Sequence, residues 1–221
     1  MIAKHLISDV VPALRKTDKG QKALNLMDVF RISHLPLVDD DQYLGIISDK
    51  MIYDLDLADA VIGEQDIKLS TPHVHLSQHI FEVASIMYKL KLSVVPVVDN
   101  KHVYYGVITL YELARRFSNL YSVHEPGGVI LLEMNALNYS MSQLAQIVES
   151  NNVKILSSFI NRVPGTNNLL VTIKLNSIEL SAVQQTLARY DYDVKAVYMD
   201  NSALDDLYDD RFEQFMKYMN I

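Results

Sequence analysis

Apolar and polar positions in the first 122 residues follow the same pattern twice. Residues 26–39 run Leu-Met-Asp-Val-Phe-Arg-Ile-Ser-His-Leu-Pro-Leu-Val-Asp, and residues 86–99 run Ile-Met-Tyr-Lys-Leu-Lys-Leu-Ser-Val-Val-Pro-Val-Val-Asp. Further along, Gly-Ile-Ile-Ser at 45–48 matches Gly-Val-Ile-Thr at 106–109, after one inserted residue. Matches this numerous in one register indicate an internal repeat, and a repeat decides the architecture before any single motif does.

The first repeat opens with a predicted helix. Helical spacing relates the apolar residues Ala23, Leu24, Met27 and Phe30. Thr17 or Asp18 is the expected N-cap of this helix, because both side chains can accept a hydrogen bond from its first amides. Residues 34–38 then predict a short buried strand, and its proline favours a late start or a bulge.

The rest of the repeat predicts a hairpin and a second helix. Polar residues 39–42 form the turn, and residues 43–47 form the partner strand. Ser48 or Asp49 is expected to cap the helix that follows. Each repeat is therefore a β-α-β-β-α unit of about 60 residues, and two copies can bury their sheets against each other.

The following segment predicts a second kind of domain. Residues 125–128, Glu-Pro-Gly-Gly, form the expected linker. We expect strands at 129–134, 154–160, 169–175 and 194–199. One helix is expected to begin at Ser140 or Ser142 and to end at Asn151, and another covers 178–190. The order β-α-β-β-α-β is that of a ferredoxin-like split unit.

The last segment, residues 200–221, combines acidic residues with an apolar stripe at helical spacing. We expect an amphipathic helix that docks on its own chain or on a sister subunit. The alternative is a peptide that contacts another protein.

Composition excludes several classes of function. The chain of 221 residues has no cysteine, which excludes disulfides, iron–sulfur clusters and cysteine nucleophiles. Its 7 glycines are not spaced as a dinucleotide fingerprint, a P-loop or a nucleophile elbow. A net charge of −7 and the lack of a basic stripe argue against nucleic-acid or anionic-membrane partners. With no long apolar run and no signal peptide, we expect a soluble cytoplasmic protein.

The repeated pattern, a helix, S-h-x-P-h-h-D (h, apolar), a turn and G-h-h-[ST] before a second helix, resembles a tandem pair of CBS domains. The resemblance implies CBS repeats at 1–62 and 63–122. The β-α-β-β-α-β segment at 126–200 resembles an ACT domain by element order, and the acidic tail at 201–221 follows it. The combination resembles the acetoin-utilisation B-type regulators, and it implies an α/β fold of a CBS pair with a ferredoxin-like domain.

The CBS resemblance implies a regulatory ligand, AMP, ADP, ATP or S-adenosylmethionine, in the clefts between the repeats, and no cofactor. In this family the motif hydroxyl and the helix amides face the phosphate, and an acid three residues later accepts from the ribose hydroxyls. The matching positions are Ser33, Pro36, Gly45 and Ser48 in the first repeat, and Ser93, Val95, Pro96, Gly106, Thr109 and Glu112 in the second. Additional phosphate partners are sought among Lys101, His102, Arg115 and Arg116.

The two motifs differ at the acid position. The first repeat has Met51 there, which removes a hydrogen bond to a charged group, so we expect ribose binding to weaken about tenfold to a hundredfold. The second has Glu112, which either accepts from a ribose or pairs with Arg115 or Arg116 on the helix face.

The remaining candidate chemistry favours binding over catalysis. ACT domains that bind amino acids commonly have Pro-Gly where Met141 and Ser142 stand here, so a dimerising role is favoured over an amino-acid ligand. His73, His75 and His79 are expected to be loop residues rather than metal ligands, and His34 a cleft or core residue. We therefore expect a non-enzymatic homodimeric sensor, with a ligand-free interaction module as the alternative.

Overall fold

A computed structural model of the chain describes residues 1–199, so the predicted acidic tail at 201–221 lies outside the described residues. The described chain divides into two compact units, one spanning Met1–Arg116 and one beginning at Phe117. Within residues 1–199, none of the helices has the length and apolarity that a membrane-spanning helix needs. The domain limits at 62 and 122 stay predictions.

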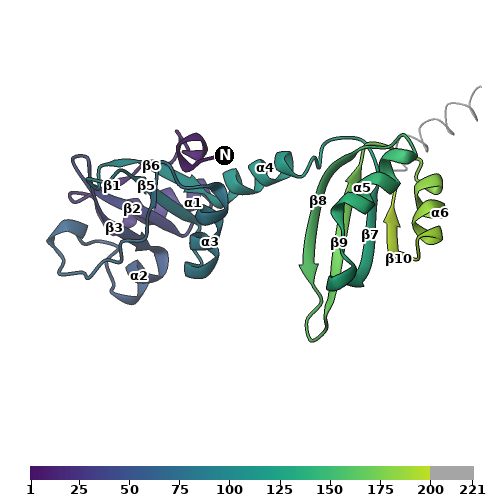
Figure 1. Cartoon of the computed structure of the whole chain (residues 1–221). Helices are drawn as coiled ribbons and strands as arrows, with labels where there is room; N and C mark the ends of the chain where they lie inside the picture. Colours follow the sequence, from purple (N-terminus) through teal and green to yellow (C-terminus); the bar gives the residue numbers. More distant parts are fainter. Residues whose placement is uncertain (200–221) are drawn as a thin grey trace, which may run out of the picture. The chain divides into compact units, whose positions relative to one another are not determined.

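The first unit contains two copies of the predicted β-α-β-β-α order (Figure 1). The first copy consists of β1 (Leu14–Arg15), α1 (Gly20–Phe30), β2 (His34–Asp39), β3 (Gln42–Ser48) and α2 (Asp49–Asp54). The second consists of β4 (Val74–His75), α3 (Ile80–Leu90), β5 (Val94–Val98), β6 (Tyr104–Thr109) and α4 (Leu110–Leu120). Short 3-10 turns, η1 (Ala3–Leu6) and η2 (Ile62–Glu64), precede the two copies.

Each copy forms a three-stranded sheet, in the orders β1-β2-β3 and β4-β5-β6. The first strand pairs parallel to the second, and the second and third form an antiparallel hairpin. Pro36 and Pro96 lie inside the central strands, but β1 and β4 are two residues long and pair only with the residues that follow each proline. A missing N–H on that side therefore costs no ladder bond. The predicted bulge is present, one residue later, after Leu37 and after Val97.

The helix ends show which capping predictions hold. Ser48 caps α2, because its Oγ accepts a hydrogen bond from the Met51 amide at 3.1 Å. The prediction for α1 was wrong, since the helix begins at Gly20 with Lys19 as an N-cap that makes no side-chain bond. The carboxylate of Asp18 is used instead by the Arg15 amide, at 2.9 Å, and by the Lys22 ammonium, at 2.8 Å.

The two repeats exchange the segments that precede their first strands. The amide of Ile46, on β3, donates to the Ser70 carbonyl at 2.9 Å, so the segment before β4 crosses the first sheet. The amide of Ser8 donates to the Val107 carbonyl at 2.8 Å, so the N-terminal segment crosses the second. Each sheet is thus completed by the other repeat, which explains why the copies fold as one unit.

The second unit is a four-stranded antiparallel sheet in the order β10-β7-β9-β8. Its strands are β7 (Val129–Asn135), β8 (Ile155–Arg162), β9 (Asn168–Leu175) and β10 (Asp193–Tyr198). The helices α5 (Met141–Ser150) and α6 (Ser181–Arg189) pack on it, and a short turn, η3 (Ala136–Asn138), follows β7. Figure 1 shows this ferredoxin-like arrangement, which confirms the predicted order.

The core of this unit lies between the sheet and the two helices, around Leu132, Leu144, Ile173 and Leu187. Ser140 caps α5, as one of the two predicted alternatives. The helix α6 begins three residues later than predicted, because the Glu179 carboxylate accepts from the Ser181 amide at 2.9 Å and holds the preceding residues in a turn.

Candidate functional site

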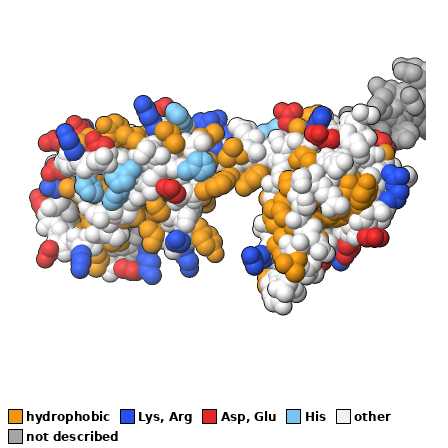
Figure 2. Space-filling view, viewed as in Figure 1, with side chains coloured by type: hydrophobic (Ala, Val, Ile, Leu, Met, Phe, Trp, Pro, Cys, Tyr) orange, Lys and Arg blue, Asp and Glu red, His pale blue; other side chains and the backbone are white. Residues whose placement is uncertain are grey.

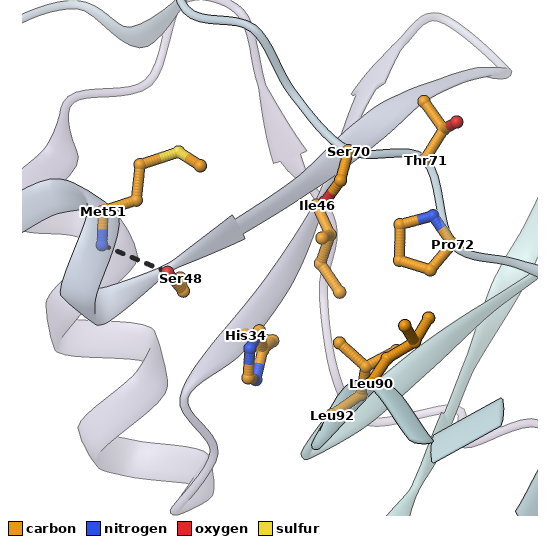
Figure 3. A pocket seen from close by; sticks show the side chains of 9 residues that line it. All are labelled: His34, Ile46, Ser48, Met51, Ser70, Thr71, Pro72, Leu90 and Leu92. Carbon is orange, nitrogen blue, oxygen red and sulfur yellow. Dashed lines mark hydrogen bonds between the residues drawn. The ribbon is translucent and has the colours of Figure 1, made fainter. Parts of the chain in front are cut away.

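A cavity of about 500 Å³ lies beneath the first motif, between the two repeats (Figure 3). Its volume is in the range of small-molecule sites in proteins. The first repeat contributes His34, Ile46, Ser48 and Met51. The second repeat and the segment before it contribute Ser70, Thr71, Pro72, Leu90 and Leu92. Because both repeats supply the walls, a molecule in this cavity contacts the whole pair.

His34 joins the cavity to the contact between the repeats. The Ser93 amide donates to His34 Nδ1 at 3.3 Å, and the oxygens Ser93 Oγ and Ser33 Oγ lie 3.1 and 3.0 Å from the same nitrogen. The Ser33 amide donates in turn to Ser93 Oγ at 2.9 Å. The two motif serines, at equivalent repeat positions, therefore link the repeats both directly and through His34.

These contacts fix the protonation of His34. A backbone N–H can only donate, so Nδ1 accepts and the proton of the neutral ring is on Nε2. Burial lowers the pKa of His34, and the nearby carboxylate of Asp49 offsets that effect only in part. The ring is therefore neutral at pH 7 and presents a donor, Nε2–H. The interpretation of His34 as a cleft residue is confirmed by its place in the cavity wall.

The second motif holds a cluster of opposite charges. Thr109 Oγ1 caps α4 by accepting from the Glu112 amide at 3.0 Å. The Glu112 carboxylate accepts two hydrogen bonds from the Arg115 guanidinium, both 3.0 Å, and one from Arg116 Nε at 2.6 Å. Burial alone would raise the pKa of Glu112, but the two guanidinium groups outweigh it and lower that pKa. Of the two predicted roles for Glu112, the ion pair is the one observed.

This ion pair is not a fully exposed surface contact. The Glu112 side chain is 15% exposed, and that of Arg116 is 30% exposed. Arg116 Nη2 also donates to the His5 carbonyl at 3.3 Å, and the Ile7 side chain lies against Gly106. The N-terminal segment therefore borders the second motif in the way that Ser70–Pro72 borders the first.

The structure separates some predicted site residues from the clefts. Val95 is fully buried, where it faces Ile108 across the hairpin. Lys101 and His102 lie before β6, and Thr109 is the last residue of that strand. An extended strand rises about 3.3 Å per residue, so these two residues do not reach the motif and their proposed phosphate role is wrong. Pro36 lies opposite Ile46 in the β2–β3 hairpin, and the segment that contains Leu69 passes over Gly45.

Sequence reasoning missed half of the cavity wall. Thr71 and Pro72 stand at the repeat position of Val11 and Pro12. Leu90 is the last residue of α3, and Leu92 lies in the turn between α3 and β5. The repeat by itself does not reveal these residues, because the segment that precedes one copy is seen to cross the other only in the assembled pair.

Histidines also gather on the first unit, as Figure 2 shows in pale blue. The ring of His73 lies 5.4 Å from that of His75 and 5.1 Å from that of His102, measured between centroids. His75 Nδ1 is buried without a hydrogen-bond partner, so the prediction of solvated loop histidines was wrong for His75. Within the described part of the chain, no three His, Asp or Glu residues are placed to share a metal ion.

The repeated part of the chain matches a known domain family. The model of the CBS domain matches residues 3–57 and 65–119. Inosine-5'-monophosphate dehydrogenase of Helicobacter pylori is 30% identical over 93 residues, which are 41% of this chain and 19% of that enzyme. The chain thus spans about a fifth of the length of the curated relatives it matches.

Three solved structures resemble part of this chain. A candidate acetoin utilization protein from Vibrio cholerae is 24% identical, covers 56% of this chain and 95% of its own, and has a TM-score of 0.48. A CBS domain pair/ACT domain protein from Thermotoga maritima is 18% identical, with coverages of 54% and 98% and a TM-score of 0.47. A CBS domain pair in complex with 5'-methylthioadenosine and S-adenosyl-L-methionine is 25% identical, with coverages of 54% and 97% and a TM-score of 0.44.

Proposed function

This chain belongs to the CBS domain family, of which it carries two copies in tandem, and on that premise we propose that it is a non-enzymatic regulatory protein that senses an adenine nucleotide or an adenosyl compound. Ligand in a cleft between the repeats would favour one arrangement of the pair. The second, ACT-like unit would receive that change, because α4 begins at the second motif and continues across the boundary at Phe117.

The cavity between the repeats carries this proposal. Its walls come from both copies, so an occupant is bound by groups that belong to two separately folded sheets. A ligand that contacts both copies binds the assembled pair more tightly than a separated one, and only such a difference in affinity can shift an equilibrium. This is the physical requirement for a sensor.

The second motif offers the groups that a phosphorylated ligand needs. Each guanidinium has five N–H donors, and those of Arg115 and Arg116 that Glu112 does not use can bind phosphate oxygens. Glu112 Oε2 accepts one hydrogen bond in the described structure, so it retains a lone pair for a ribose hydroxyl. The helix α4, 11 residues long, directs its N-terminal amides to the same place.

A melting experiment tests the proposed function. We expect AMP, ADP, ATP or S-adenosylmethionine to raise the melting temperature as the concentration of the compound increases. At a hundred times the dissociation constant, the free energy of unfolding should rise by about 2.7 kcal/mol. Thr109→Ala with Glu112→Ala should remove the shift that phosphorylated compounds cause. If none of the four compounds shifts melting at about millimolar concentration, the sensor function is wrong and a ligand-free interaction module replaces it.

The ligand-free alternative has its own support in the chain. Met51 stands where the motif has an acid, and Met141–Ser142 opens α5 where ACT domains that bind amino acids commonly have Pro-Gly. The melting experiment decides between the two functions.

The proposal includes a homodimer built through the helices of the first unit. Tyr88 on α3 and Tyr111 on α4 are 85% and 78% exposed, which is unusual for large aromatic side chains on a monomer. We expect light scattering to give twice the chain mass, and Tyr88→Glu with Tyr111→Glu to give the mass of one chain. Leu137→Glu, at a position 94% exposed in the second unit, is the matched control and should remain dimeric. A monomeric unmodified protein contradicts the prediction.

A further inference from the structure

The cavity at the first motif has no charged wall within the described residues. Five of its nine lining side chains are apolar, and the other four are His34, Ser48, Ser70 and Thr71. In a chain with 21% charged residues, a wall of nine without one Lys, Arg, Asp or Glu is a distinct chemical environment. A phosphate enclosed by these nine side chains would meet no Lys or Arg among them, and an enclosed charge without a partner is disfavoured.

The second motif gives an internal comparison at equivalent positions. Where Arg115 and Arg116 flank Glu112, the first motif has Met51 in place of the acid and continues into α2, a helix of 6 residues. The first residue of α2 is Asp49, where α4 has Leu110, so a negative charge stands at the end of the helix that would otherwise attract a phosphate. The two motifs therefore differ in the charge of the ligand that they favour.

The polar groups of the cavity suit a neutral ligand with acceptor atoms. His34 is held as the Nε2–H tautomer by the Ser93 amide, and this N–H has no partner among residues 1–199. Ser48 Oγ accepts from Met51 and keeps its own proton for donation. Two such donors on apolar walls match the ring nitrogens and hydroxyls of a nucleoside. Neither donor brings the positive charge that would compensate a phosphate.

We propose that the first cleft binds an uncharged purine nucleoside or its 5'-thioether, and rejects the 5'-phosphorylated forms of the same nucleoside. The adenine-type character of the ligand rests on the function proposed above, whereas the selection against phosphate rests on the composition of the wall. We expect the preference for the neutral form to be at least about tenfold, the effect of one hydrogen bond to a charged group left without its partner.

The experiment compares adenosine and 5'-methylthioadenosine with AMP and ATP on the full chain. Calorimetric titration gives the affinities, and the carbon-13 methyl resonance of Met51 reports binding at this cleft. That resonance is assigned among the 9 methionines by its absence from the Met51→Gln variant. We expect the neutral compounds to shift the Met51 resonance, and AMP to do so only at concentrations at least about tenfold higher.

A substitution that adds a positive charge to the cavity wall gives the second test. Met51→Arg adds a cation to the wall and should raise the affinity of this cleft for AMP by about tenfold or more, with adenosine affected much less. Met51→Gln has a similar length without the charge and should not gain AMP affinity. Glu112→Gln changes only the second motif and should leave binding of neutral compounds at Met51 unaltered. Melting of each variant without ligand shows that it is folded.

The outcomes separate this inference from the proposed function. Neutral compounds that shift Met51, with AMP weaker, support the inference. AMP that binds at Met51 as tightly as adenosine overturns it. The inference is also overturned if the neutral compounds leave the Met51 resonance unshifted and lose their binding in Thr109→Ala. In both of these cases the sensor function survives. Failure of every compound at both motifs contradicts the proposed function itself.

Discussion

Replacing Ile47 or Ile108 by alanine is expected to lower the free energy of unfolding of the first unit by about 2–5 kcal/mol in each case. The two residues occupy equivalent places on β3 and β6, and both are fully buried. Across their hairpins they face Leu35 and Val95, which are also fully buried. Truncation removes transfer free energy and leaves a cavity, because the surrounding strands can close only partly.

Urea unfolding followed by circular dichroism measures this effect. Val29→Ala is the control, since Val29 is on α1 and 71% exposed, and we expect its effect to be within about 0.5 kcal/mol. If either core substitution cost no more than the control, the interior of that hairpin would not be buried as described here. Similar losses at both positions would show that the repeats contribute equally to one folding unit.

The repeat made most of the first unit predictable. Matching residues in two copies fix the order of elements, and apolar runs such as Val94–Val98 have no other place than a buried strand. The helix starts were less predictable, because several polar residues compete for the same turn. Asp18 is a good N-cap by type, yet its carboxylate accepts from Arg15, three residues before it, and leaves Lys19 at the cap.

The site was predictable in its motifs and not in its walls. Ser48 and Thr109 cap their helices as the repeated pattern indicates. By contrast, Ser70 reaches the first motif only because its segment crosses β3, and this crossing is a property of the assembled pair. The choice of Glu112 between a ribose and an ion pair depends on rotamers of Arg115 and Arg116, which the spacing of the residues leaves open.

The same crossing predicts an unequal effect of substitution at the two motif glycines. Gly45 has φ +153° and Gly106 has φ +140°, backbone conformations that residues with a Cβ rarely adopt. At Gly45 a Cβ would lie 2.6 Å from Leu69 Cβ and 2.9 Å from the Ser70 carbonyl oxygen. At Gly106 its nearest atom would be Ile7 Cγ2, at 2.5 Å, the end of a side chain that can rotate away.

Gly45→Ala is therefore expected to cost about 2–6 kcal/mol of stability, since backbone strain and overpacking act together. Gly106→Ala should cost about 1–3 kcal/mol, because strain acts there largely alone. Urea unfolding gives both values. Gly45 should be the more sensitive of the two positions, and equal losses would mean that the Leu69–Ser70 backbone yields as readily as the Ile7 side chain.

The steric effect at Gly45 should also weaken ligand binding, because the segment that must move there forms one wall of the first cavity. Ser70, Thr71 and Pro72 follow Leu69 directly, so a shift of this segment withdraws one side of the site from its occupant. We expect Gly45→Ala to weaken adenosine binding at the Met51 resonance by about tenfold or more, and Gly106→Ala to leave it nearly unchanged. Unaltered affinity in a folded Gly45→Ala protein would show that the Ser70–Pro72 segment does not contact the ligand, and that recognition is confined to the groups of the first repeat.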